Sequence, residues 1–165
     1  MKQYDVVIVG GGPGGVTTAL SASNTYPEKR ILLIRREQIA LIPCGIPYTL
    51  CTLDRVEDDI LPDKPLEKNN IDLLVDEVVE IQEKELLLRS GERIKWDKLV
   101  LAVGSKAFVP PIPGVEKKGV YPVRKEIGVL KELRQRVESA ERIVIIGGGF
   151  IGVEVADELL KKGKR

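Results

Sequence analysis

The chain has no histidine, one methionine and two cysteines among its 165 residues. Without histidine it can form neither a serine–histidine triad nor a histidine-ligated metal site, and no histidine can act as a general base. The two cysteines, Cys44 and Cys51, are too few for the disulfide framework of a small secreted protein. Histidine chemistry and a disulfide-stapled secreted fold are therefore excluded.

The chain also lacks an excess of either charge and any long apolar run. Its 26 basic and 25 acidic residues leave a formal net charge of +1, which creates no broad field for nucleic acid or an anionic membrane. The apolar run Val6–Val9 is too short to cross a bilayer, and the start of the chain has no charged and apolar leader with a cleavage site. We therefore expect a soluble cytoplasmic protein with no nucleic-acid or membrane partner.

Amide side chains are scarce, with three asparagines and four glutamines. Charged residues make up 31% of the chain, above a usual share of about 25%. This composition is typical of heat-adapted proteins and predicts a thermophilic source. The length is sufficient for one domain, or for one domain and part of another.

The first 34 residues have the pattern of a strand, a helix and a second strand. Val6–Val9 is a continuous β-branched run, which suits a strand buried on both faces of a parallel sheet. From Val16 the apolar period becomes helical, with Ala19 and Leu20 on the same face. Ile31–Ile34 is the second apolar run, so we expect a βαβ unit.

The rest of the chain predicts shorter elements. A loop at 42–53 leads into a short helix, and the two prolines in 61–65 indicate another loop. Further strands are expected at 73–81, 85–89, 94–96, 99–103 and 143–146, with a turn at Ser90-Gly91. Two later helices are expected, one with Leu130, Leu133 and Val137 on its face and a last one with Ile151, Val155 and Leu159, ending at Gly163. Between the strand at 99–103 and the first of these helices, Pro110, Pro111, Pro113 and Gly114 form a stiff connector and a candidate domain boundary.

A glycine motif follows the first strand. Gly10, Gly12 and Gly15 fit the pattern G-x-G-x-x-G. The first glycine permits a tight turn, the second allows the backbone to approach a pyrophosphate, and the third allows helix and strand to pack closely. The free N–H groups of the helix start then bind the phosphates. The motif predicts a dinucleotide site, with a ligand-free glycine turn as the alternative.

The second strand departs from the pattern of such sites. An acidic residue is expected at its end, where it would bind the ribose hydroxyls, but Arg35 stands there. Arg35 or Arg36 could contact a phosphate, and Glu37 could reach the ribose from two residues later. The alternative is that both arginines are solvated.

A second glycine motif ends the chain, with Gly147, Gly149 and Gly152 at the same spacing. Glu154 is expected in the first helical turn, where a carboxylate suits the helix dipole. The spacing of Asp157 and Lys161, and of Glu158 and Lys162, predicts two i,i+4 ion pairs on a solvated face. Two such motifs in one chain imply two dinucleotides.

Together these features resemble the first part of the pyridine nucleotide–disulfide oxidoreductases, flavoenzymes that hold FAD on the first motif and NAD(P)H on the second. The stretches Leu101–Ser105 and Pro111–Gly114 resemble the family's segment between the two domains, with Val103 where threonine is more usual. Asp97–Val100 precedes it as in the family, and Asp76–Val78 resembles the strand whose backbone meets the adenine. The resemblance covers essentially the whole chain, from Tyr4 to Lys162.

The resemblance implies an α/β fold. Residues 1–114 would form a Rossmann-like FAD-binding domain with a small antiparallel β meander, and residues 115–165 the first strand–turn–helix of a second Rossmann-like, NAD(P)H-binding domain. The implied cofactor-binding residues are Gly10, Gly12, Pro13, Gly14, Gly15, Arg35, Val78, Ala102, Gly104, Ser105, Gly147, Gly149, Phe150, Ile151 and Gly152. The later parts of both domains and the family's dimerisation domain are not in the sequence, which predicts a fragment or one part of a split protein. The intact protein is expected to be a homodimer.

The segment Pro43-Cys44-Gly45-Ile46-Pro47-Tyr48 resembles the single-cysteine branch of the family, which includes coenzyme A-disulfide reductases, NADH oxidases and NADH peroxidases. A cysteine at a helix start has a stabilised thiolate, and Pro47 is tolerated in a first helical turn. The resemblance implies that Cys44 relays electrons from FAD to a disulfide, a polysulfide or an oxygen species. The alternatives are a buried structural Cys44, a flavin reductase that does not use the thiol, and a nucleotide-binding fragment without catalysis. Cys51 is expected to be a packed or partly exposed thiol, and a Cys44–Cys51 disulfide is a lesser alternative.

Overall fold

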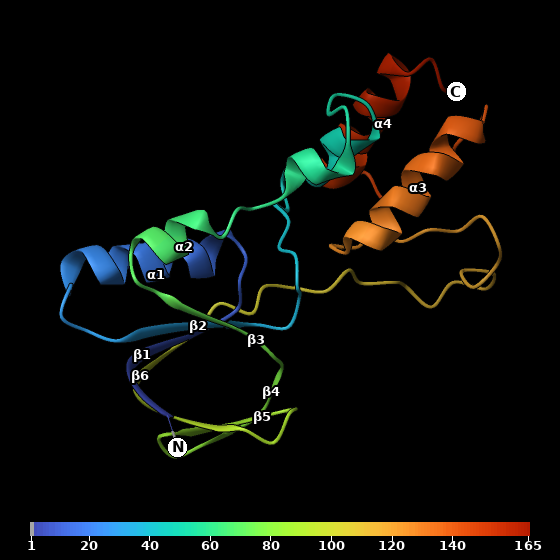
Figure 1. The fold of residues 1–165 in the computed structure, drawn as a ribbon. Helices are drawn as coiled ribbons and strands as arrows, with labels where there is room; N and C mark the ends of the chain where they lie inside the picture. Colours follow the sequence, from blue (N-terminus) through green and yellow to red (C-terminus); the bar gives the residue numbers. More distant parts are fainter. Residues whose placement is uncertain (1) are drawn as a thin grey trace. The chain divides into compact units, whose positions relative to one another are not determined.

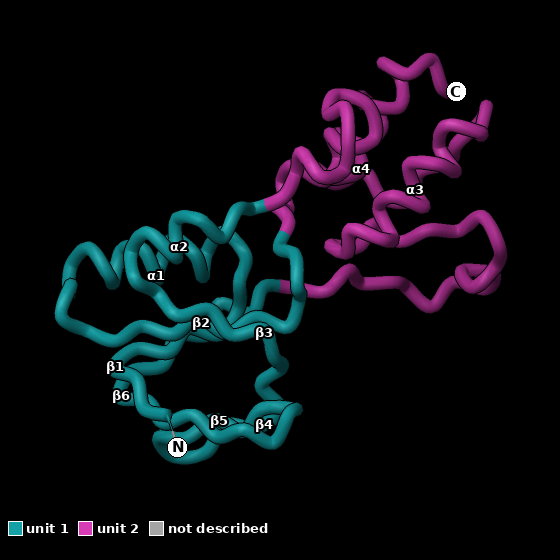
Figure 2. The backbone as a smooth tube through the Cα atoms, in the orientation of Figure 1, with its two compact units in different colours: residues 1–40, 61–104 teal, residues 41–60, 105–165 magenta. Residues whose placement is uncertain are grey.

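The computed structural model describes residues 2–165. These residues form two compact units (Figure 2). The first comprises the chain up to residue 40 together with 61–104, and the second comprises 41–60 together with 105–165. The division differs from the predicted boundary at residue 114, because the segment that contains Cys44 packs with the later part of the chain. The domains of residues 1–114 and 115–165 remain a prediction.

The first unit is built on a six-stranded sheet in the order β3-β2-β1-β6-β5-β4 (Figure 1). The strands are β1 (Lys2–Val9), β2 (Ile31–Arg35), β3 (Asp72–Val75), β4 (Val78–Gln82), β5 (Glu85–Leu88) and β6 (Arg93–Leu101). Strands β3, β2, β1 and β6 are parallel, whereas β6, β5 and β4 pair antiparallel. The parallel sheet and the antiparallel meander are thus joined through β6, and both were predicted.

Both faces of the parallel strands are covered. Helices α1 (Pro13–Thr25) and α2 (Lys64–Lys68) lie on one face in Figure 1, where Ile8 and Leu33 pack with Val16 and Ala19. On the opposite face, Val7 and the neighbouring strand residues pack against the meander. The continuous apolar runs of β1 and β2 are explained by this burial on two sides, and the βαβ prediction is confirmed.

Several predicted strand limits are wrong. The expected strand 73–81 is two strands, because Asp76 N–H donates to Arg35 in the parallel sheet whereas the Glu77 carbonyl accepts from Arg89 in the meander. The expected strands 94–96 and 99–103 are one strand, β6. The end of the expected strand is not buried, since Leu101, the last residue of β6, is 57% exposed and Val103, two residues beyond it, is 68% exposed. The helix α2 begins inside the predicted loop 61–65, and Pro65 lies in its first turn, where a missing N–H costs nothing.

The second unit consists of two short 3₁₀ helices and two α-helices. These are η1 (Ile46–Leu50), η2 (Val56–Asp59), α3 (Ile127–Ser139) and α4 (Phe150–Lys161). The buried side chains Leu130 and Val137 of α3, and Val155 and Leu159 of α4, lie on the predicted helical faces. The predicted connector around residues 110–114 contains neither helix nor strand.

Two expectations for the end of the chain are wrong. Residues 143–146 are not a strand, because no neighbouring segment of residues 2–165 pairs with them in a sheet. Ile151 is 60% exposed rather than part of the buried face of α4. Gly163 does end this helix as predicted, with a φ of +73° and its N–H bonded to the Leu160 carbonyl.

Candidate functional site: two glycine turns and an exposed cysteine

The first glycine turn connects β1 to α1. Gly10 has a φ of +120°, and a Cβ at this position would overlap the backbone carbonyl of Ala102 on the neighbouring strand. A Cβ on Gly15 would overlap the carbonyl oxygen of Gly10. Only glycine therefore permits both the turn and the close approach of helix to strand.

The start of α1 is left open by this turn. Gly12 is the N-cap residue and makes no side-chain cap, and Pro13 occupies the first helical position. Apart from the adjoining residues and the backbone of α1 itself, no atom of residues 2–165 lies within 4 Å of where a Cβ on Gly12 or Gly14 would stand. The unpaired N–H groups of a first helical turn, together with the positive end of the helix dipole, form an anion site.

The second glycine turn repeats the geometry of the first. Gly147 has a φ of +119°, Gly149 is the N-cap of α4, and a Cβ on Gly152 would overlap the Gly147 carbonyl oxygen. The N-cap dihedrals agree closely, with φ −77° and ψ −178° at Gly12 and φ −76° and ψ 178° at Gly149. The same glycine turn is thus built twice. Phe150, the first residue of α4, is 90% exposed.

Arg35 lies beside the first turn. Its side chain is 2% exposed, and its aliphatic carbons fill the space next to Gly11. The two terminal nitrogens donate to Asp63 at 2.5 and 2.6 Å, and one also donates to the Gln38 carbonyl at 2.9 Å. The alternative of a solvated Arg35 is therefore wrong. Arg36 and Glu37 form an exposed ion pair with an N–O distance of 2.5 Å.

Cys44 lies in the second unit and is exposed, so the alternative of a buried structural cysteine is wrong. It precedes Gly45, the N-cap of η1, and Pro47 lies in the first turn as expected. The helix is a single 3₁₀ segment of five residues rather than a full α-helix. Cys51 is partly exposed, and both cysteines are free.

Glu158 is buried, although its i,i+4 spacing from Lys162 had predicted a solvated helix face. It is fully buried, and it accepts hydrogen bonds from the Thr52 N–H and hydroxyl at 2.7 Å each. Its ion pair is with Lys161 at 2.8 Å, whereas Lys162 pairs with Glu138, so the predicted Glu158–Lys162 pair is wrong. Burial raises the pKa of Glu158, but the bonds from Lys161 and Thr52 outweigh it and leave that pKa below its usual value.

Two other expectations on α4 have different outcomes. The predicted Asp157–Lys161 pair is confirmed, with an N–O distance of 2.7 Å. Glu154 lies beyond the first helical turn rather than in it, because α4 begins at Phe150.

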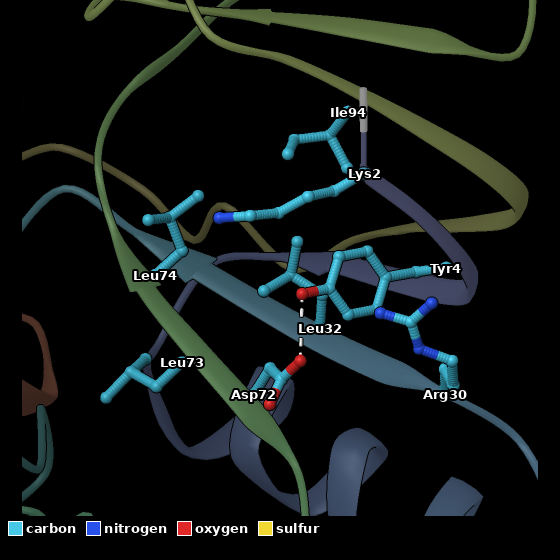
Figure 3. A pocket seen from close by; sticks show the side chains of 8 residues that line it. All are labelled: Lys2, Tyr4, Arg30, Leu32, Asp72, Leu73, Leu74 and Ile94. Atoms are coloured by element: carbon cyan, nitrogen blue, oxygen red, sulfur yellow. Dashed lines mark hydrogen bonds between the residues drawn. The ribbon is translucent and has the colours of Figure 1, made fainter.

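A cavity of about 430 Å³ lies in the first unit (Figure 3). It is lined by residues at the amino ends of the parallel strands, whereas Gly10 follows the carboxyl end of β1. Tyr4 donates a hydrogen bond of 2.8 Å to Asp72, and Arg30 stacks on the Tyr4 ring at 4.9 Å. Burial and the bond to Asp72 raise the pKa of Tyr4. None of the predicted site residues lines this cavity.

Among residues 2–165, no three cysteine, aspartate or glutamate side chains gather as they would around a metal ion. Over the same residues, no helix combines the length and apolar character needed to cross a bilayer.

Known proteins share both the sequence pattern and the fold. The family model for pyridine nucleotide-disulphide oxidoreductases matches residues 4–165. The NAD(P)H coenzyme A polysulfide/persulfide reductase of Pyrococcus horikoshii is 36% identical over 96% of the chain, and an NADH oxidase of Methanocaldococcus jannaschii is 32% identical over 95%. In both cases the chain spans 38% of the relative's length.

Solved structures agree with this assignment. The reduced CoADR-RHD of Bacillus anthracis has a TM-score of 0.87 and 26% identity, covering 100% of this chain and 32% of its own. The NAD-dependent persulfide reductase of A. fulgidus has a TM-score of 0.86 and 26% identity, covering 97% of this chain and 32% of its own. The chain belongs to the pyridine nucleotide-disulphide oxidoreductase family.

Proposed function

We propose that the chain supplies the flavin-binding turn, the redox cysteine and the first part of the nicotinamide-binding unit of an FAD-dependent NAD(P)H oxidoreductase. The observation that carries this proposal is the repeated glycine turn in a chain that also has an exposed cysteine, which lies between the two turns in the sequence. Two such turns suit two dinucleotides, and an accessible thiol suits an electron relay.

The residues of the first turn fit FAD. The backbone of Gly12, Pro13 and Gly14 forms the start of α1, which has no side-chain cap and has open space beside Gly12 and Gly14. A pyrophosphate would be bound there. FAD bound there would supply two-electron redox chemistry between a nicotinamide and an oxidised sulfur. We assign the remaining predicted contacts to residues after β6 and at the start of β4, which are Ala102, Gly104, Ser105 and Val78. In the second turn, Gly147, Gly149, Phe150, Ile151 and Gly152 would hold NAD(P)H.

Asp63 is the acidic group that we assign to the ribose hydroxyls of FAD. Arg35 stands where an acidic residue is usual; its aliphatic carbons lie beside Gly11, and its guanidinium binds both oxygens of the Asp63 carboxylate. The Asp63 side chain is 36% exposed, and a carboxylate has about four acceptor positions, so two remain for a ligand. Arg35 then contributes through Asp63, or through the predicted contact with a phosphate. The predicted ribose contact of Glu37 remains the alternative.

Cys44 is the proposed link to the electron acceptor. A Cys44 thiolate attacks the sulfur–sulfur bond of a disulfide or polysulfide, forms a mixed disulfide and releases the other sulfur as a thiolate. The names of the relatives, a polysulfide/persulfide reductase and an NADH oxidase, support a sulfur or oxygen acceptor.

Replacing Cys44 with serine is expected to abolish NAD(P)H-dependent disulfide reduction, with a loss of at least about 100-fold, because a hydroxyl does not form the mixed disulfide. The assay follows NADH oxidation by the flavin-loaded protein in the presence of coenzyme A disulfide. Cys51→Ser is the matched control and should retain activity.

Two outcomes of this assay favour other functions. Oxygen consumption that survives Cys44→Ser would favour a flavin reductase that does not use the thiol. A chain that binds nucleotides but oxidises no NADH would favour a binding unit without catalysis of its own.

The remaining assignments follow the composition and the family. We propose a cytoplasmic location and a homodimer for the intact protein.

We also propose adaptation to heat, because charged residues are abundant and amides scarce. Calorimetry of the chain should then give a melting temperature above the range of about 45–65 °C that is typical of mesophile domains. A value inside that range would contradict heat adaptation.

A further inference from the structure

Glu158 of α4 is a buried carboxylate that binds the segment containing both cysteines. Its side chain is fully buried, and its two oxygens accept from the Thr52 N–H and the Thr52 hydroxyl at 2.7 Å each. Lys161 donates a third hydrogen bond at 2.8 Å. A carboxylate is costly to bury unless donors compensate the lost water, and three donors do so here. Glu158 is therefore a fixed polar contact between α4 and the residue that follows Cys51.

Arg134 of α3 binds the same turn of the backbone. One of its terminal nitrogens donates to the carbonyls of Thr49 and Leu53 at 2.8 Å each. Leu50, between them in the sequence, is 3% exposed and packs with apolar side chains of both α3 and α4. Glu158 and Arg134 thus form a clamp on the turn that ends η1, with one side chain from each helix.

The clamp is connected to Cys44 through η1. The Leu53 N–H donates to the Tyr48 carbonyl at 2.8 Å, and the Tyr48 N–H donates to the Gly45 carbonyl at 3.0 Å. Gly45 and Ile46 directly follow Cys44, and Ile46 is 4% exposed in a cluster with side chains of α3. Hydrogen bonds and apolar packing therefore join the clamped turn to the residues next to Cys44, and η1 is tied to the two helices at both of its ends.

We propose that Glu158 and Arg134 are positioning residues for Cys44, which fix the cysteine segment (residues 41–60) on the unit that would bind NAD(P)H. The inference rests on the proposed role of Cys44 as the electron relay. Without the clamp the segment is free to shift, and a small displacement of a reacting group slows the step that uses it. Steps that do not use the thiol keep their rates.

The first test is hydrogen exchange, followed by NMR in the 165-residue chain without cofactors. Glu158→Gln keeps the size of the side chain but leaves one acceptor oxygen for the two donors of Thr52. The amides of Tyr48 and Leu53, which do not bond to Glu158 themselves, should then exchange at least about fivefold faster, whereas the amides of β1 should not change. Acceleration confined to the Thr52 amide would overturn the proposal, as would an equal acceleration throughout the chain.

Two further variants separate the clamp from ordinary charge effects. Arg134→Met removes the donor to the two carbonyls of the turn, so it should accelerate the same amides as Glu158→Gln. Asp157→Asn removes the neighbouring carboxylate of α4, which is 63% exposed and pairs with Lys161, and it should leave their exchange unchanged. A response to Asp157→Asn as large as that to Glu158→Gln would also contradict the clamp.

The second test uses the flavin-loaded protein and compares two electron acceptors. With coenzyme A disulfide, whose reduction needs the thiol, Glu158→Gln should lower kcat by at least about tenfold and leave the KM for NADH within about twofold of the parent value. With ferricyanide, which takes electrons without a thiol, the rate should be unchanged. An equal loss with both acceptors would show that Glu158 acts on the whole fold and not on the position of Cys44.

The two tests distinguish this inference from the proposed function. A protein that oxidises no NADH but shows the expected exchange would refute the proposed function and leave the clamp on the cysteine segment in place. An active protein in which Glu158→Gln changes neither the exchange nor kcat would refute the clamp alone.

Discussion

Replacing Asp63 with alanine is expected to lower the free energy of unfolding by about 2–4 kcal/mol. The Arg35 side chain is 2% exposed, and Asp63 binds both of its terminal nitrogens. Without Asp63, the buried guanidinium keeps one bond, to the Gln38 carbonyl. Since the Asp63 side chain is 36% exposed, water entering the gap keeps the loss below that of a fully buried pair. Urea unfolding followed by circular dichroism measures the difference.

Two further variants separate the buried pair from ordinary surface charge. Asp157→Ala breaks the exposed pair with Lys161 and should change the free energy of unfolding by no more than about 0.5 kcal/mol. Combining Asp63→Ala with Arg35→Met removes the uncompensated charge while keeping the aliphatic contact with Gly11, and should restore most of the lost stability. Equal losses for Asp63→Ala and Asp157→Ala would show that burial of Arg35 does not depend on Asp63.

The backbone of the two glycine turns was predictable because glycine alone meets its requirements. A positive φ at Gly10 and Gly147, and a helix packed onto a carbonyl at Gly15 and Gly152, leave no room for a Cβ. Local sequence therefore determines this part of the site. The buried strands were predictable for a similar reason, since continuous apolar runs are stable only when both faces of the sheet are covered.

The polar contacts around the site were not predictable in the same way. The partner of Arg35 lies 28 residues away, and that of Glu158 lies 106 residues away. The spacing of Glu158 and Lys162 is that of a solvated helix face, and only the packing of α4 against the segment that contains Thr52 makes Glu158 a buried group. The burial of Asp59 carried no signal in the sequence, because it comes from the fold, which leaves its Oδ2 without a partner among residues 2–165.

Replacing Gly15 with alanine is expected to weaken FAD binding by at least about tenfold and to lower the free energy of unfolding by about 1–3 kcal/mol. The new Cβ would overlap the carbonyl oxygen of Gly10. Helix α1 must then move away from β1. This displaces the N-terminus of α1 from the position at which we propose that it binds FAD. Calorimetric titration with FAD measures the affinity, and urea unfolding measures the stability.

The second turn and a third helix provide controls for this substitution. Gly152→Ala creates the same overlap with the Gly147 carbonyl, so it should weaken NADH binding and leave FAD binding unchanged. Gly128→Ala places a Cβ in open space on α3, and there alanine should be neutral or stabilising by about 0.5–1 kcal/mol. If Gly15→Ala bound FAD as the parent does, the close approach of α1 to β1 would not be what forms the flavin site. If Gly15→Ala and Gly152→Ala both weakened FAD alone, the second turn would not be an independent nucleotide site.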